Sequence, residues 1–406
     1  MRKWFPLLLC LVFLLTGCAQ AELTQPAPSA GAQEAPIPAE KKAPFEDDYK
    51  ALWDALENSY PYLPYLAEQG LDVHGIYDRY ALALPSVTDE GAFYGMLRRM
   101  LAELKNFAHL DVVSPEMYRS YYSIYVLGDV VSEEYSRPFA EILQDARLSG
   151  RYQPPASPDS GGQHPGTSRY PDVAVQYFPN CKTLYLQIPS FAQELVERDR
   201  DIVYDALARY PESEHIIFDI TGNSGGSDYY WMHNLVAPFG GRHEFSFRTF
   251  FKSSPLVKKY YGAVLSSPVS DLDDAPAWVE KMGLDRFFVS ELVLPDPSAP
   301  RETLPGGIDR WLLISENVFS ASDKFAGFCK ATGWATVVGT RTAGDGLGSA
   351  PILLLLPDSG LLIRFSSMAG ENPDGSINAV AGTNPDAVCP GGELPLNRCL
   401  ELIRGE

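Results

Sequence analysis

The spacing of apolar residues divides this chain into a helical front part and a rear part in which strands and helices alternate. Between residues 45 and 110, apolar side chains recur three or four positions apart, which is the spacing that buries one face of a helix. We predict three helices there. The first covers residues 49–60, the second covers 73–84 and is ended by Pro85, and the third starts at 88–90 with a capping residue and an acidic first turn.

From residue 173 onward, apolar runs of strand length follow one another with helical stretches between them. The predicted strands are 173–178, 183–188, 215–219, 311–315, 335–338, 352–356 and 361–365. The predicted helices are 194–210, one from about 228, and one that begins at 320–323 and is stopped by Gly333. This alternation predicts a layered α/β domain. The apolar pattern of residues 242–307 does not indicate which helices or strands they form.

The N-terminal residues are expected to lie outside this fold. Two basic residues precede an apolar run at 7–15, and the sequence Leu-Thr-Gly-Cys ends at Cys18. This arrangement resembles a bacterial lipoprotein signal. It implies removal of residues 1–17, lipid on Cys18, and a body held outside the cytoplasm at a membrane. The alternative, an uncleaved anchor helix, is disfavoured by the short apolar run.

The remaining chain is predicted to contain four regions of different character. Residues 18–44 are rich in Ala, Pro, Gln and Glu and are expected to form a flexible tether. A helical domain follows at 45–115, then a connecting region at 116–172 that contains a mobile loop rich in Pro, Gly and Ser. The α/β catalytic domain is expected to cover 173–406.

Composition narrows the possible partners and cofactors. The formal net charge of -19 makes nucleic acid and anionic membrane surfaces poor partners. There is no CxxC or HExxH motif, so we predict neither a metal nor a cofactor. Export permits disulfides, and Cys389 and Cys399 are the best candidate pair, whereas Cys329 lies on an apolar helix face and is expected to be a buried thiol.

A serine pair at a predicted helix start carries the candidate chemistry. Ser320 and Ser322 lie directly before the apolar pattern of the helix, where unpaired backbone N–H groups and the positive end of the helix dipole are found. A serine there can attack a carbonyl while neighbouring amides hold the developing oxyanion. Capping the helix is the alternative role for either serine, and it is the usual one.

Five motifs in order resemble peptidase family S41, the C-terminal-processing and tricorn-like serine peptidases. They are YLQIPSF at 185–191, DITGNSGG at 219–226, FSASDKFA at 319–326, ATVVGTRTAG at 335–344 and GTNPD at 382–386. The resemblance implies a crotonase-like or ClpP-like α/β catalytic domain preceded by a small N-terminal helical domain. It also implies hydrolysis of peptide bonds in peptide or protein substrates, with Ser320 rather than Ser322 as the nucleophile.

The same resemblance implies a histidine base. One branch of the family uses a lysine, but the corresponding loop here reads Gly344-Asp345-Gly346. The other branch holds a histidine at the end of its helical module, and the segment LKNFAH matches it loosely, with His109 at the histidine position and Asn106 at an aspartate position. An imidazole near its ordinary pKa suits proton abstraction from serine. Without the resemblance, His109 would be a histidine favoured by a helix C-terminus.

The glycine turn is the third part of the implied site. The resemblance assigns the oxyanion contacts to the backbone N–H groups of Gly225, Gly226 and Ala321, and glycine allows such close approach of a backbone. A plain tight turn is the other interpretation. Ser224 lies in a Gly-Asn-Ser-Gly-Gly segment that imitates trypsin-like peptidases, but their all-β fold does not fit the alternating pattern of this chain.

Several positions depart from the family pattern. Thr221 replaces an arginine, Ala108 replaces the serine beside the histidine, and 378–379 reads Asn-Ala where a glutamate is expected. The residue that orients His109 is therefore not predicted, and no PDZ pattern is found between His109 and residue 173. Two functions follow: a membrane-tethered extracytoplasmic serine peptidase, or a catalytically impaired module of the same fold that binds a peptide or an apolar ligand.

Overall fold

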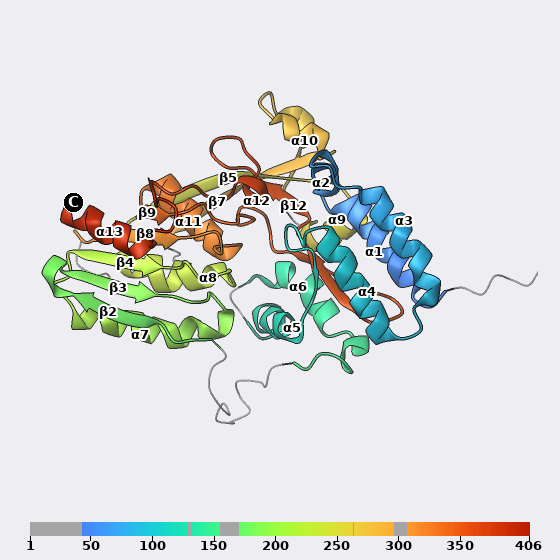
Figure 1. Ribbon diagram of the computed structural model, residues 1–406, viewed down its shortest axis with the longest axis horizontal. Coiled ribbons are helices and arrows are strands. Elements are labelled where there is room, and N and C mark those ends of the chain that lie inside the picture. The colour runs from blue at the N-terminus through green and yellow to red at the C-terminus, as the bar shows by residue number, and fades with distance from the viewer. Residues whose placement is uncertain (1–42, 129–130, 155–169, 263, 296–306) are drawn as a thin grey trace, which may run out of the picture. The chain divides into compact units, whose positions relative to one another are not determined.

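A six-stranded sheet organises the rear part of the chain (Figure 1). The structure, a computed structural model, describes residues 43–128, 131–154, 170–262, 264–295 and 307–406. In the strand order β13-β9-β8-β4-β3-β2, only β2 and β3 pair antiparallel, as the predicted hairpin. The strands are β2 (Ala174–Phe178), β3 (Thr183–Gln187), β4 (His215–Asp219), β8 (Asp309–Ile314), β9 (Thr336–Gly339) and β13 (Ala387–Val388).

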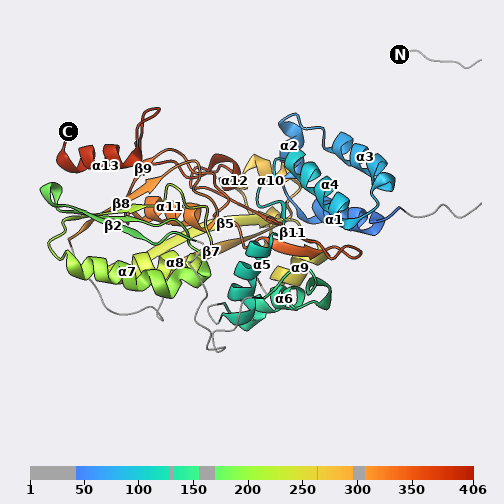
Figure 2. The same ribbon diagram turned by 60° about the horizontal axis from the view of Figure 1, so that its bottom comes forward.

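Helices cover both faces of this sheet (Figure 2). Along β4, Ile216 and Phe218 pack in one apolar cluster with α7 (Val196–Arg209), α8 (Asp228–Trp231) and α11 (Ala321–Thr332). Ile217 points to the opposite face, where α13 (Pro395–Arg404) packs. The alternation of side chains along a strand buried on both faces explains why its sequence is continuously apolar. The predicted layered α/β class is confirmed.

The front part is helical, as predicted. Its first four helices are α1 (Glu46–Ser59), α2 (Leu63–Glu68), α3 (Val73–Ala83) and α4 (Glu90–Glu103). Asp89 caps α4 by accepting a hydrogen bond of 2.9 Å from the N–H of Ala92. Two further helices, α5 (Pro115–Tyr122) and α6 (Glu133–Leu143), form where the apolar pattern is weak, and the sequence pattern did not indicate them.

Two smaller sheets connect the front and rear parts. The first has the order β1-β11-β10 and contains β1 (Asp111–Val112), β10 (Ile352–Leu355) and β11 (Leu362–Phe365). The second has the order β12-β5-β7-β6 and contains β12 (Met368–Gly370), β5 (His243–Phe251), β7 (Arg286–Leu294) and β6 (Ser267–Pro268). The unassigned residues 242–307 therefore contribute a long antiparallel pair, β5 with β7, as well as α9 (Pro255–Tyr261) and α10 (Ala277–Lys281).

The remaining elements are short turns of helix. They are α12 (Asn378–Ala381) and the 3₁₀ or π turns Leu84–Ser86, Ser123–Leu127, Ala146–Leu148, Pro179–Cys181, Gln193–Leu195, Met232–Val236, Ala237–Phe239 and Val269–Asp271. Gly333 ends α11 in the left-handed conformation with φ 65°, as its sequence indicates.

The core of the front helices continues into the C-terminal hairpin. Leu52 and Leu97 of the front helices belong to the same buried cluster as Ile352 and Ile363 of β10 and β11. β1 pairs antiparallel with β11, placing Asp111 opposite Arg364. The domain boundaries predicted at residues 115 and 172 stay predictions. The buried apolar cluster continues across residue 115 without a break.

Some sequence expectations concern segments that the structure does not describe. The predicted disulfide between Cys389 and Cys399 is wrong. The predicted signal peptide, Cys18, most of the tether and most of the predicted mobile loop lie outside the described residues. None of the described helices is long and apolar enough to cross a membrane. Cys389 and Cys399 are free thiols rather than a disulfide, and both pack in the apolar cluster beneath α13. Cys329 is buried as expected, and burial raises the pKa of its thiol.

One carboxylate in α1 holds the turn between β10 and β11. Asp48 is fully buried and accepts hydrogen bonds from the N–H groups of Asp358 (2.6 Å) and Ser359 (2.9 Å). We predict that Asp48→Ala lowers the free energy of unfolding by about 3 kcal/mol, because two backbone N–H groups of the turn lose their buried, charged acceptor. Urea unfolding measures this change.

The matched control is Asp54→Ala, which removes an exposed carboxylate from the same helix. It should change the free energy of unfolding by no more than about 0.5 kcal/mol. Equal unfolding midpoints for Asp48→Ala and the unmodified protein would show that this contact does not anchor the hairpin.

Candidate active site

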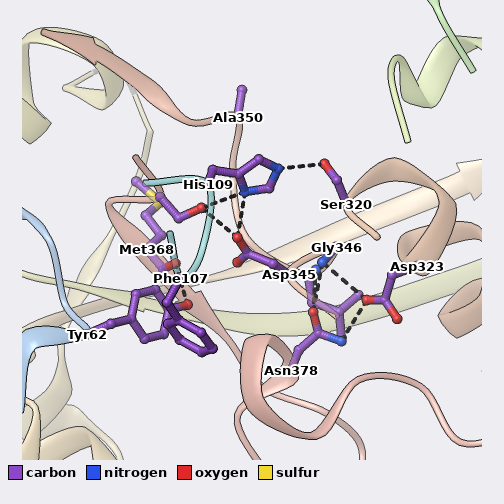
Figure 3. Close-up of polar contacts among 12 residues, drawn as sticks. Tyr62, Phe107, His109, Ser320, Asp323, Asp345, Gly346, Ala350, Met368 and Asn378 are labelled. Carbon is purple, nitrogen blue, oxygen red and sulfur yellow. Dashed lines mark hydrogen bonds and ion pairs between the residues drawn. The ribbon is translucent and has the colours of Figure 1, made fainter. Parts of the chain in front are cut away.

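Ser320 occupies a strained position at the start of α11. Its backbone has φ 58° and ψ -127°, outside the conformations that non-glycine residues ordinarily adopt, and its N–H donates to the carbonyl oxygen of Gly344 (2.9 Å). Although Ser320 stands at the N-cap position, its side chain makes no capping hydrogen bond. The hydroxyl is instead directed toward the imidazole of His109 (Figure 3).

The neighbouring serines have different surroundings. Ser322 is fully buried, and its hydroxyl donates to Oδ1 of Asn223 (2.7 Å). Ser224 is exposed, and within the described part of the chain no hydrogen bond joins it to a histidine. Of the three serines considered from sequence, only Ser320 therefore combines access to solvent with a basic partner.

His109 ends a tightly coiled loop after α4. Lys105, Asn106, Ala108 and His109 all have positive φ, between 47° and 66°. The side-chain amide of Asn106 donates to the carbonyl of Leu110 (3.2 Å), so the residue at the family's aspartate position supports the loop. Such conformations are costly for non-glycine residues and persist only when the surroundings fix them.

Contacts from other elements hold this loop from both sides. The N–H of Ser366, just after β11, donates to the carbonyl of Ala108 (3.0 Å). The hydroxyl of Tyr60 donates to the carbonyl of Phe107 (2.7 Å), and the ring of Phe319 packs on that of His109 with centroids 4.4 Å apart. The imidazole is thereby fixed at 6 % exposure, between the front helices and the start of α11.

The two ring nitrogens of His109 contact different partners (Figure 3). Nε2 lies 3.0 Å from Oγ of Ser320, whereas Nδ1 lies 2.5 Å from Oδ2 of Asp345 and 3.0 Å from Oγ of Ser366. The hydroxyl of Ser366 donates to the same carboxylate oxygen (2.8 Å). Because a carboxylate accepts hydrogen bonds, this arrangement favours the tautomer with the proton on Nδ1 and a lone pair on Nε2 facing the serine.

Burial sets the charge state of this histidine. Removal from water lowers the pKa of His109 below its ordinary value of 6.5, and the nearby charge of Arg364 lowers it further. Asp345 acts in the opposite direction through its negative charge and its hydrogen bond. The net shift is downward, so the imidazole is neutral at pH 7 and able to accept a proton.

Asp345 is the orienting residue that sequence reasoning missed. In the sequence, the Gly344-Asp345-Gly346 loop stands out only because it lacks the lysine of one family branch, although its acidic residue is the available signal. The loop is held by Asp323, which is buried and accepts hydrogen bonds from Thr342 Oγ1 (2.5 Å) and the N–H of Gly346 (3.1 Å). Burial raises the pKa of the Asp323 carboxyl, while these hydrogen bonds oppose that shift.

Asn378 completes the support of this loop. Its side-chain oxygen accepts hydrogen bonds from the N–H groups of Gly346 (2.8 Å) and Leu347 (3.1 Å), and its amide donates to Asp323 (2.9 Å) (Figure 3). The residue found in place of the expected late glutamate therefore does not contact His109. It positions the loop that carries Asp345.

The three predicted oxyanion amides are not equivalent. The N–H of Gly225 already donates to Oδ1 of Asn223 (2.9 Å), the atom that also accepts from Ser322. Gly226 is exposed, and the N–H groups of Gly226 and Ala321 have no acceptor among the described residues. A Cβ on Gly226 would lie 2.3 Å from the carbonyl oxygen of Phe191, so glycine is required for this turn.

A sequence model of peptidase family S41 matches residues 182–389, just over half of the 406-residue chain. The chain belongs to peptidase family S41. The matched segment contains Ser320, Asp345 and the glycine turn, whereas His109 lies outside it, in the front part of this S41 protein.

Two solved structures share the fold along most of their length. A candidate peptidase from Parabacteroides merdae is 19% identical with a TM-score of 0.53, covering 89% of this chain and 97% of its own. A lipoprotein from Streptococcus agalactiae is 12% identical with a TM-score of 0.50, covering 91% of this chain and 99% of its own. At these identities the likeness concerns the fold alone, and it extends over the front helices of the S41 protein.

The candidate site of this S41 protein opens into a cavity of about 930 Å³. Front and rear elements both line it: Met117 and Tyr121 come from α5, and Phe288 and Leu292 come from β7. Within the described ranges, no group of three or more His, Cys, Asp or Glu side chains is arranged to hold a metal ion. Polar and apolar side chains both line this cavity beside the Ser320–His109 pair.

The protonation of His109 provides a direct test of this geometry. We predict that NMR titration of the ring gives a pKa below 6.5, and that Asp345→Asn lowers it further, because the negative charge that favours the imidazolium is removed.

Asp386→Asn is the control, since Asp386 pairs with Lys330 (2.8 Å) outside the site. It should leave the titration of His109 unchanged. A pKa of His109 at or above 6.5 in the unmodified protein would mean that burial does not dominate its environment.

Proposed function

We propose that this chain is an extracytoplasmic serine peptidase in which Ser320 attacks a peptide carbonyl and His109 transfers the proton. The observation that carries the proposal is the continuous contact from Ser320 Oγ through the two ring nitrogens of His109 to Asp345. Membership of peptidase family S41 supports hydrolysis as the chemistry. We assign the rear domain to the crotonase-like or ClpP-like type, with the front helices as an N-terminal module.

The first step is attack by the serine oxygen. A substrate carbonyl held beside Ser320 receives the oxygen as its proton moves to Nε2 of His109, which lies 3.0 Å away. The imidazolium formed in this step is stabilised by Asp345 at Nδ1. Asp345 thus acts through His109, as an orienting and charge-stabilising residue.

The developing oxyanion requires donors that are already in place. The N–H groups of Gly226 and Ala321 are the proposed donors, since both lie in the cavity lining and neither has an acceptor among the described residues. Ala321 begins α11, so the positive end of the helix dipole adds to the stabilisation. Gly225 is then assigned a supporting role, since its amide holds the turn to Asn223.

The tetrahedral intermediate collapses when His109 returns its proton to the leaving amine nitrogen. The C–N bond breaks and an ester between Ser320 and the acyl part remains. His109 then accepts a proton from water, the water oxygen attacks the ester carbonyl, and the second collapse returns the proton to Ser320. Every proton in this sequence passes through Nε2.

The cellular setting is part of the proposal. The lipobox-like segment ending at Cys18 supports removal of residues 1–17 and lipid attachment, which would tether the enzyme to the bacterial membrane outside the cytoplasm. The alternative function, an impaired binding module, was motivated by the lack of an orienting residue for His109. The contact between Asp345 and His109 supports the active peptidase over the binding module.

Covalent labelling tests the nucleophile. We predict that a fluorophosphonate labels the unmodified protein, that Ser320→Ala abolishes labelling, and that His109→Ala slows it by about 10³-fold, because the serine loses its base. Intact-protein mass spectrometry measures the modification.

Ser224→Ala is the matched control, because Ser224 is an exposed serine that lines the same cavity. Its labelling rate should equal that of the unmodified protein. Undiminished labelling of Ser320→Ala would refute the assignment of the nucleophile.

The pH dependence of labelling tests the base. The serine is activated only by neutral imidazole, so the rate should be constant above pH 7 and fall as the pH drops through the pKa of His109, below 6.5. Stopped-flow measurement with a fluorogenic phosphonate would give this profile. A rate that still rises between pH 7 and 9 would point to a base other than His109.

A further inference from the structure

An arginine that has no ionic partner among the described residues lines the same cavity. Arg364 belongs to β11 and borders the space into which Ser320 and His109 open. Among the described residues no ion pair to its guanidinium occurs, and its buried Nε has no hydrogen-bond acceptor. Arg364 is half-buried, and leaving a partly desolvated guanidinium without an anion is unfavourable, so an anionic group entering the cavity would be stabilised by contact with it.

The strand register places this side chain beside the catalytic machinery. Residues two apart on an extended strand point to the same face and are separated by about 7 Å. Ser366, two residues after Arg364, contacts Nδ1 of His109, and its N–H donates to the carbonyl of Ala108, so the pairing seen in β1 continues to this point. Arg364 therefore lies on the same face of the strand as Ser366, the residue that contacts His109. The distance between Arg364 and Ser366 is roughly that spanned by two residues of extended peptide.

The other charged groups around Arg364 leave it available. Asp111 is opposite Arg364 in the strand register, but its carboxylate accepts a hydrogen bond from the N–H of Val112 and forms no ion pair with the arginine. Lys324, the lysine that lines the cavity, is paired with Asp228 (2.6 Å). The influence of Arg364 on the pKa of His109 supports its closeness to the site.

We propose that Arg364 binds a carboxylate of the substrate about two residues from the scissile bond. A guanidinium matches a carboxylate through two parallel hydrogen bonds, which fixes orientation as well as affinity. The carboxylate is either an Asp or Glu side chain or the α-carboxylate of a substrate C-terminus. This specificity rests on the proposed peptidase function, but it predicts a binding preference that is measurable without turnover.

The test uses the full-length Ser320→Ala protein and rhodamine-labelled decapeptide mixtures with acetylated N-termini. One arm compares Glu with Gln at each position in turn, all with amidated C-termini. The other arm compares free with amidated C-termini in mixtures that contain no acidic residue. Fluorescence anisotropy should give about 10- to 100-fold tighter binding of the carboxylate form in one arm, the size expected for a charge-assisted pair.

Substitutions of Arg364 test whether the preference for a carboxylate depends on its side chain. In the Ser320→Ala background, Arg364→Gln should abolish the preference and leave binding of the neutral peptides within about threefold. Arg364→Lys should retain part of it, because the charge remains but the two-pronged geometry is lost. The control is Arg209→Gln, which removes an exposed arginine of α7 and should change nothing.

The outcomes separate this inference from the proposed function. Equal binding of charged and neutral peptides, or no binding of either in both arms, overturns the role of Arg364. A carboxylate preference that survives Arg364→Gln overturns it as well. A preference that depends on Arg364 in a protein whose unmodified form hydrolyses none of the preferred peptides upholds the binding role and refutes the peptidase.

Discussion

The antiparallel contact between the loop after α4 and the end of β11 is the constraint on which the site depends. Ser320 and His109 are 211 residues apart in the chain, and the hydrogen bond from Ser366 to Ala108 fixes the histidine loop against the rear part. A shift of this pairing by one residue would turn the Ser366 side chain to the opposite face. The proposed mechanism therefore requires the front helices, because their docking determines where the imidazole lies.

The site concentrates unfavourable backbone conformations, and a buried polar network holds them. His109, Ser320 and Asp345 all have φ near 60°. Each such residue costs on the order of 1 kcal/mol or more and is stable only where its surroundings fix it. Asp323 and Asn378 provide that fixation for the Asp345 loop through buried hydrogen bonds. In the sequence these two residues look like ordinary polar residues. Their role in supporting the Asp345 loop is visible only from the contacts in the folded protein.

Elements with a local signal were predictable, and contacts between distant segments were not. The helix start at Ser320, its stop at Gly333 and the buried strands each follow from residues within a few positions of one another. Asp345 contacts His109 only in the folded chain. From the sequence around Asp345 one can see that the family's lysine is missing, but not that Asp345 is the partner of His109. β5 and β7 were missed because they are joined through a long connection with two short helices. Cys389 and Cys399 are close in sequence, but closeness does not ensure disulfide geometry.

In the proposed mechanism, one strand would couple substrate recognition to catalysis. β11 carries Arg364 toward the cavity and is followed directly by Ser366, which contacts both His109 and Asp345. A substrate anion bound to Arg364 would therefore contact the same strand that supports the imidazole of His109. The cavity walls include α5 of the front part and β7 of the rear part, so a bound peptide would contact both. Substrate binding would thus favour the docked arrangement of the front helices in which the base faces the nucleophile.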